Sequence, residues 1–262
     1  MDVIKNNDRS TGKFEFPMIQ EPSRCGCGTS SPADLVNALP RPDQPFVSGS
    51  LATPAGTLPK VSSELTRHDR WGTIKARLNV GRMTYGIDPG LYALGSPDDQ
   101  SPVLVTANYK MSFDYLRQAM TDRHAWILVL DTKGINVWCA AGKGTFGTQE
   151  LIRRIESSGL KKVVGHRKII VPQLGAPGVA AHQVRQFTGF RVHYGPVRAA
   201  DLPAYLDAGL KATNDMRLMT FPFKDRAVLI PVELTQAVKP LIFFCAALLI
   251  LAGLLGPDRK SV

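Results

Sequence analysis

The chain has 262 residues and a net charge of +10, so it can hold one domain with extensions or two small domains. Hydrophobic residues make up 44% of it, which is enough for a sizeable core and excludes a wholly disordered protein. Its four cysteines exclude a disulfide-stapled secreted scaffold and favour a reducing, cytoplasmic setting for the main domain.

The first part of the chain, residues 1–70, is rich in Pro, Gly and Ser. A stretch such as 52–56 shows no sustained periodicity, so we expect an irregular arm with a helical turn at 33–38. Cys25 and Cys27 are separated by one residue, which is too little for the usual CxxC metal motif. We interpret them as two incidental thiols, with a redox or metal role as the alternative.

Beyond residue 70, short apolar segments alternate with short amphipathic ones. This alternation predicts a mostly parallel α/β sheet in a domain that covers residues 71–233. The expected strands are 103–106, 126–130, 162–164, 168–171 and 191–194, and the expected helices are 112–120, 148–157, 179–187 and 201–207.

Ligands of such sheets collect at the carboxyl ends of the strands. The residues at these ends are small, amide-bearing or hydroxylated, and few are charged. They suit a large neutral ligand rich in amides better than a phosphate or a bare cation, although ordinary turns would look similar. The segments concerned are 106–108, 131–132, 172–175 and 194–197.

Residues 241–255 form an uncharged apolar run. As a helix this run is about 22 Å long, short of the ~30 Å hydrocarbon core of a bilayer. Adding 237–240, with Lys239 reaching to the interface, nearly closes the difference. Because little chain follows that could bury the run, we interpret 234–262 as a transmembrane segment of a truncated membrane domain. A buried core helix is the alternative.

Positive charge is concentrated in residues 151–226, which carry thirteen Lys and Arg against five Asp and Glu. A basic domain beside a membrane is attracted to anionic headgroups. Nucleic acid is the rival partner, but no helix-turn-helix, zinc-finger or RNP pattern is visible, so we expect none to bind. A solvated basic face is the simplest interpretation.

The most informative segment is 134–148, which follows a strand. It is no P-loop, because Val137 and Gly144 stand where that motif needs Gly and Ser or Thr. Gly142, Gly144 and Gly147 have GxGxxG spacing, but no acidic residue follows the next strand, as a dinucleotide site requires. Residues 122–127 resemble the cobalamin motif DxHxxG but lack its glycine and precede a strand, so this motif is excluded.

What remains in that segment is a cysteine in a turn of small residues. In a helix over 136–143, Cys139 and Lys143 lie on one face at i, i+4 spacing. A nearby ammonium group favours the thiolate, which is the nucleophilic and metal-binding form. The alternative is an inert buried thiol, which is the more common state of a free cysteine.

The octapeptide Asn136-Val137-Trp138-Cys139-Ala140-Ala141-Gly142-Lys143 resembles the cap-helix signature of HgcA, the family of mercury-methylating corrinoid proteins. The likeness runs from about Pro102 to Glu233, and the family is related to the corrinoid iron–sulfur protein of the acetyl-CoA pathway. This chain departs from the family in having one candidate span instead of several and a longer irregular arm.

The resemblance implies a Rossmann-like corrinoid-binding α/β domain between an irregular N-terminal arm and a C-terminal transmembrane helix. It also implies cobalamin as cofactor and the Cys139 thiolate as the lower axial ligand of cobalt. Further cofactor-binding residues would lie along the same helix and at the strand ends. These are Asn136, Val137, Trp138, Ala140, Ala141, Gly142, Lys143, Gly144, Thr145, Thr148, Thr106, Asn108, Gln173, Tyr194 and Gly195.

The activity implied is methyl transfer from methylcob(III)alamin to Hg(II), giving methylmercury. Hg(II) is an electrophile, so the methyl group must leave cobalt with its bonding electrons, and a donating thiolate stabilises the Co(III) that remains. The implied partners are the ferredoxin-like 4Fe–4S protein HgcB and a methyltetrahydrofolate-dependent methyl donor system. The implied location is the cell inner membrane, with the corrinoid domain in the cytoplasm.

Two other functions remain open. One is a corrinoid methyl carrier of one-carbon and acetyl-CoA metabolism, which would pass methyl groups to a protein partner without acting on mercury. The other is a membrane-tethered binding module without a corrinoid, which would purify colourless.

Overall fold

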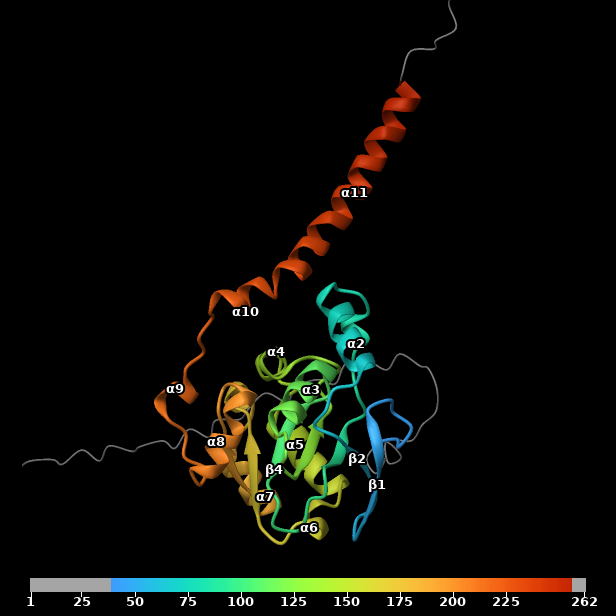
Figure 1. Cartoon of the computed structure of the whole chain (residues 1–262). Coiled ribbons are helices and arrows are strands. Elements are labelled where there is room, and N and C mark those ends of the chain that lie inside the picture. Colours follow the sequence, from blue (N-terminus) through green and yellow to red (C-terminus); the bar gives the residue numbers. More distant parts are fainter. Residues whose placement is uncertain (1–38, 256–262) are drawn as a thin grey trace, which may run out of the picture.

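Seven strands form one mixed sheet in the computed structural model, which describes residues 39–255 (Figure 1). The strand order is β1-β2-β3-β5-β4-β6-β7. The pairs β1–β2 and β3–β5 are antiparallel and the other pairs are parallel. The strands are β1 Val47–Thr53, β2 Gly56–Val61, β3 Gly90–Leu94, β4 Val103–Ala107, β5 Ala125–Leu130, β6 Lys168–Val171 and β7 Arg191–Tyr194.

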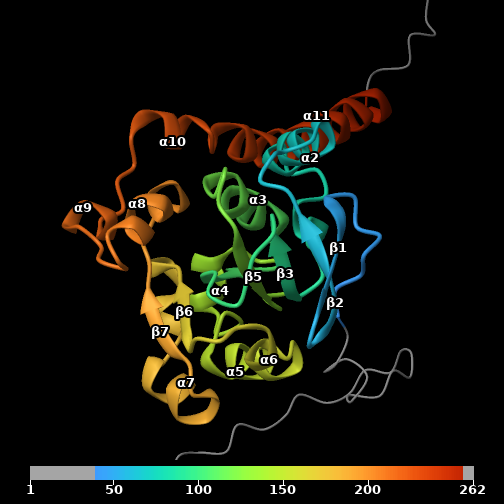
Figure 2. The same cartoon turned by 60° about the horizontal axis from the view of Figure 1, so that its bottom comes forward.

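Helices cover both faces of this sheet (Figure 2). They are α2 Arg67–Arg77, α3 Lys110–Ala119, α4 Val137–Gly142, α5 Thr148–Ser157, α6 Leu160–Val163, α7 Ala181–Thr188, α8 Leu202–Asp207, α9 Asn214–Arg217, α10 Phe223–Ala227 and α11 Ile230–Leu255. Short 3-10 turns are η1 Arg82–Thr84, η2 Gln173–Gly178 and η3 Ala199–Asp201.

The central strands are buried on both faces because their side chains alternate between two cores. In β5, Leu128 and Leu130 belong to the core under α5 and α7, whereas Ile127 and Val129 belong to the core under α3 and α8. The continuous apolar runs that predicted these strands are therefore explained, and the α/β class is confirmed.

The structure corrects three expectations. Residues 47–61 form the β1–β2 hairpin rather than an irregular arm, because Leu58 and Val61 bury one face of β2. Residues 162–164 are not a strand, because Gly159 has φ +63° and starts the helical turn α6. Strand β3 was missed, and it introduces an antiparallel pair. The expected turn at 33–38 and Cys25 and Cys27 lie outside the described residues.

The helix α11 extends away from the sheet domain (Figure 1). Among the described residues, one helical stretch, 225–253, is long and apolar enough to cross a membrane, and its most apolar window has a mean hydropathy of 2.0. None of that window is buried against the other described residues. A buried core helix, the alternative raised by the sequence, is therefore not what the structure shows.

Candidate functional site

The helix α4 carries Cys139 and is defined by signals at both ends. At its start, Asn136 is the N-cap, and its Oδ1 accepts a hydrogen bond of 2.9 Å from the backbone N–H of Cys139. Beyond its end, Gly144 has φ +78°, the left-handed conformation that glycine adopts most easily. The cap therefore fixes the backbone of Cys139 itself.

The loop that leads from β5 into α4 is held by Asn108, which follows β4. Its Oδ1 accepts hydrogen bonds from the backbone N–H of Thr132 at 3.0 Å and of Gly134 at 2.9 Å, and from the Thr132 hydroxyl at 2.8 Å. The carboxyl ends of β4 and β5 are thereby joined as expected. Asn108 is buried, and its side chain holds this loop.

Asp131, in the same loop, pairs with Lys133 at 2.6 Å. Burial raises the pKa of the Asp131 carboxyl, but the hydrogen bonds and charge of Lys133 outweigh this effect and hold the pKa below its ordinary value. Asp131 is therefore an ionised, paired group and not a proton donor near neutral pH.

The two faces of α4 differ sharply. Val137, Ala140 and Ala141 are buried and fasten the helix to the core. Ala140 and Ala141, which the resemblance implies as cofactor-binding residues, therefore point their side chains into the protein. On the other face, Trp138 is 66% exposed and Cys139 is an exposed free thiol.

Open space beside α4 is found at its C-terminal glycines instead. A Cβ atom added at Gly142 or Gly144 would meet nothing within 4 Å. Lys143 is exposed between them. The exposed side of α4 from Trp138 to Gly144 is therefore the surface that a broad ligand could cover.

The turn η2 packs tightly against the loop after α4. A Cβ atom on Gly178 would lie 2.0 Å from the backbone oxygen of Phe146 and 3.3 Å from the Cα of Ala141. Thr148 joins the same elements, because its hydroxyl accepts a 2.8 Å hydrogen bond from the backbone N–H of Ala180. Thr145 is half-buried, and its hydroxyl donates to the carbonyl of Ala140 at 3.4 Å.

The other predicted site residues also contact neighbouring parts of the chain. The side chain of Gln173 is hydrogen-bonded by Arg217, and the Tyr194 hydroxyl donates to the carbonyl of Val179 at 2.7 Å. Gly195 is buried, and a Cβ atom there would lie 3.0 Å from Ile170. These residues contribute to the carboxyl edge of the sheet.

A cavity of about 730 Å³ lies beside α4 at this edge. Asn136, Trp138 and Thr106 are among its lining residues, together with residues from α2, α3, β4, β6, η2, η3, α8 and α10. Cavities of this size hold cofactor-sized groups. The structure thus brings Thr106 and the start of α4 together, as the sequence predicted.

Two polar groups near the site were missed by the sequence reasoning. Among the described residues, Arg77 Nε and Tyr109 Oη are buried without a hydrogen-bond partner. Arg77 lines the same cavity, and burial raises the pKa of the Tyr109 hydroxyl. No sequence signal pointed to Arg77, whereas Tyr109 directly follows Asn108 in a segment that carried the resemblance.

Cys139 belongs to no cluster of metal-binding side chains among the described residues. Within residues 39–255, no group of three or more His, Cys, Asp or Glu side chains is placed to hold a metal ion. One exposed thiol does not hold a bare metal ion, but it can complete the coordination of a metal whose other ligands come from a macrocycle.

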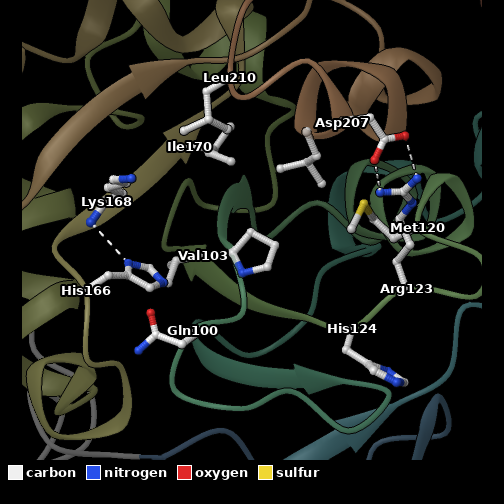
Figure 3. A pocket seen from close by; sticks show the side chains of 12 residues that line it. Gln100, Val103, Met120, Arg123, His124, His166, Lys168, Ile170, Asp207 and Leu210 are labelled. Atoms are coloured by element: carbon white, nitrogen blue, oxygen red, sulfur yellow. Dashed lines mark hydrogen bonds and ion pairs between the residues drawn. The ribbon is translucent and has the colours of Figure 1, made fainter.

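A second cavity, of about 550 Å³, lies at the opposite, amino edge of the sheet (Figure 3). Its charged residues are largely paired, since Arg123 makes two hydrogen bonds of 2.8 and 2.7 Å to Asp207. Figure 3 also shows His166, which accepts from the backbone N–H of Lys168 at 3.2 Å. Because ligands of such sheets bind at the carboxyl edge, the cavity beside α4 is the stronger candidate.

Residues 81–206 match the family model described as the CO dehydrogenase/acetyl-CoA synthase delta subunit. The chain is similar to the acetyl-CoA decarbonylase/synthase complex subunit gamma of Methanopyrus kandleri, with 32% identity over 46% of this chain and 26% of the relative. It is 32% identical to the same subunit of Methanothermobacter thermautotrophicus, over 48% of this chain and 28% of the relative.

The chain thus spans only about a quarter of the length of the curated relatives it matches. The region matched by the family model includes α4 and Cys139. These relatives are named for acetyl-CoA metabolism. They therefore support a similarity to the corrinoid iron–sulfur protein of the acetyl-CoA pathway, and they do not single out the mercury-methylating family.

Proposed function

We propose that this chain is a corrinoid-dependent methyl-transfer protein in which the Cys139 thiolate is the lower axial ligand of cobalt. The observation that carries the proposal is the exposed Cys139 on the capped helix α4, beside a cofactor-sized cavity at the carboxyl edge of the sheet. The mixed α/β fold is compatible with the Rossmann-like corrinoid domain that the resemblance implies.

The residues present fit such a group. A corrinoid is broad and carries many amides, and the open surface at Gly142 and Gly144 accepts a broad ligand. The unpartnered Nε of Arg77 in the cavity wall is a donor that a ligand amide oxygen would satisfy. Trp138, largely exposed beside Cys139, would cover part of the ligand surface.

A bound corrinoid would supply a cobalt–methyl bond as the source of the methyl group. Asn136 fixes the backbone at Cys139, so that Sγ stays in one place on the helix. Cys139 would hold the cobalt as an electron-donating thiolate ligand, which would favour transfer of the methyl group with its bonding electrons.

The methyl group has two candidate acceptors. The names of the relatives favour a methyl carrier of acetyl-CoA metabolism, which would pass the methyl group to another protein subunit. The second candidate acceptor is Hg(II), and it is favoured by the octapeptide around Cys139, which resembles the mercury-methylating signature, and by the electron-rich thiolate.

The partners differ between these two functions. A methyl carrier would work with other subunits of an acetyl-CoA complex. A mercury methyltransferase would work with HgcB as electron donor and with a methyltetrahydrofolate-dependent methyl source. Both would be held at the inner membrane by α11, because residues 234–255 have Lys239 as their only charge and span about 33 Å as a helix.

A single-turnover assay separates the two acceptors. The purified chain would be loaded anaerobically with methylcobalamin, mixed with Hg(II), and compared with the variant Cys139→Ala. Methylmercury that depends on Cys139 supports the mercury methyltransferase. Bound corrinoid without methylmercury supports the carrier, and failure to bind any corrinoid contradicts the proposed function as a whole.

A further inference from the structure

The helix α2 turns its apolar side outward, which is the reverse of what is usual for a helix that packs on a domain. Its buried residues are Asp69, Gly72 and Ala76, spaced i, i+3, i+7. Trp71, Ile74 and Leu78 follow at the same spacing on the other side and are 58%, 45% and 41% exposed. Helices of soluble domains place such apolar residues toward the core, whereas this face packs against nothing within residues 39–255.

Polar contacts hold the buried side of α2, so its orientation is fixed. Lys110 Nζ and Arg117 Nη2, both from α3, each lie 2.7 Å from the carboxylate of Asp69. Gly72 allows close approach of Tyr85, whose hydroxyl would lie 2.4 Å from an added Cβ atom. Rotation of α2 to bury Trp71 would break this ionic cluster, so the apolar face stays outward.

Basic side chains flank the apolar face. Arg67, Arg70 and Lys75 are exposed, and none of them takes part in an ion pair within residues 39–255. The apolar surface continues after the helix with Val80 and Met83, which are 56% and 73% exposed. An apolar stripe with a tryptophan and flanking basic residues is the pattern of a helix that lies in a membrane interface.

The position of α2 agrees with this pattern. Both views place α2 beside the start of α11, at the end of the molecule where α4 lies (Figures 1 and 2). A bilayer crossed by α11 would thus meet α2 first.

We propose that α2 and the segment through Met83 dock on the surface of an anionic bilayer. Trp71, Ile74 and Leu78 enter the interface, and Arg70 and Lys75 contact lipid phosphates. This proposal rests on the membrane anchoring by α11 proposed above, and it adds that the carboxyl edge with Cys139 is held facing the membrane.

Quenching of tryptophan fluorescence by brominated lipid tests the proposal on the full chain in vesicles. Trp126 is buried in the core, so the variant Trp138→Phe leaves Trp71 as the exposed tryptophan among the described residues. We expect brominated lipid to quench its emission in vesicles of phosphatidylcholine and phosphatidylglycerol. The quenching should disappear in Trp71→Phe/Trp138→Phe.

Charge variants test the role of the basic flank in the Trp138→Phe background. Arg70→Glu/Lys75→Glu should shift the equilibrium between docked and free α2 by at least about 30-fold, at about fivefold for each basic residue lost. The matched control is Lys161→Glu/Lys162→Glu, which makes the same charge change on α6 at the other end of the molecule (Figure 1). Quenching should be retained in this control.

Flotation of the vesicles separates failure of the two proposals. Protein that floats with the vesicles but shows no quenching of Trp71 would overturn docking by α2 while leaving the anchor intact. Equal loss of quenching in both charge variants would overturn the specific role of α2. Protein that does not float would contradict the anchor and, with it, this docking.

Discussion

The N-cap of α4 offers a specific test of how the site is built. In Asn136→Ala the backbone N–H of Cys139 loses the 2.9 Å hydrogen bond that Asn136 Oδ1 accepts. Loss of an N-cap costs about 1 kcal/mol, which corresponds to roughly a five-fold change in an equilibrium constant. Because α4 has only six residues, this cost falls on the turn that carries the thiol.

We therefore expect Asn136→Ala to raise the dissociation constant for cobalamin about five-fold. The measurement is an anaerobic absorption titration that follows the cobalt spectrum. Asn136→Ser is the matched control, because serine caps helices nearly as well as asparagine, and it should bind cobalamin almost as tightly as the wild type. Unchanged affinity in the alanine variant, or equal weakening in both variants, would refute the capping argument.

Three further predictions concern stability. Lys110→Met leaves the buried carboxylates of Asp69 and Asp114 with Arg117 as their remaining partner in the cluster. Urea unfolding should show that the free energy of unfolding falls by about 3–5 kcal/mol. A fall of less than about 1 kcal/mol would argue against a tightly coupled cluster. Burial raises the pKa of Asp69, but hydrogen bonds from Lys110, Thr66 and Arg117 hold it well below its ordinary value. The ionised Asp69 carboxylate therefore stabilises the fold above about pH 4, and this contribution is lost as the pH falls further. In Asp69→Asn the free energy of unfolding should fall less steeply with decreasing pH than in the wild type. The same pH dependence in both proteins would contradict this role of Asp69. Gly178→Ala places a Cβ atom against the loop after α4. It should lower the free energy of unfolding by about 1–3 kcal/mol and speed amide hydrogen exchange in α4. In the control Gly49→Ala, where the added Cβ atom meets nothing within 4 Å, α4 should exchange like the wild type.

The elements that sequence predicted well are those whose pattern reflects local burial. The strands 168–171 and 191–194 and the helix 148–157 agree with the structure to the residue. The strand predicted at 162–164 was wrong because three apolar and basic residues fit a strand and a helical turn equally well, and the positive φ of Gly159 starts the helical turn.

The β1–β2 hairpin was missed for a different reason. Residues 52–56 contain Pro and Gly and look irregular, yet they are the end of β1, a two-residue turn at 54–55 and the start of β2. The edge strand β1 is largely exposed, so its sequence carries little hydrophobic periodicity. Its pairing depends on β2 and on the rest of the sheet, which a single segment does not reveal.

At the site, the sequence located α4 and its thiol. It did not show which of the surrounding residues hold loops and which line the cavity. Asn108 was selected at a strand end and Thr148 through the resemblance, and both side chains make hydrogen bonds to neighbouring loops. Arg77 comes from a helix far away in the sequence and reaches the cavity through the fold. Such long-range placement follows from tertiary packing and leaves no local motif.

The most direct test of the central claim is the absorption spectrum of the purified full chain after anaerobic loading with methylcobalamin, recorded for the wild type and for Cys139→Ala. The account predicts a cobalt spectrum typical of thiolate ligation in the wild type, and its loss in the variant while the circular dichroism of the fold is unchanged. The same spectrum in both proteins, or no bound corrinoid in the wild type, would contradict the assignment of Cys139 as the cobalt ligand.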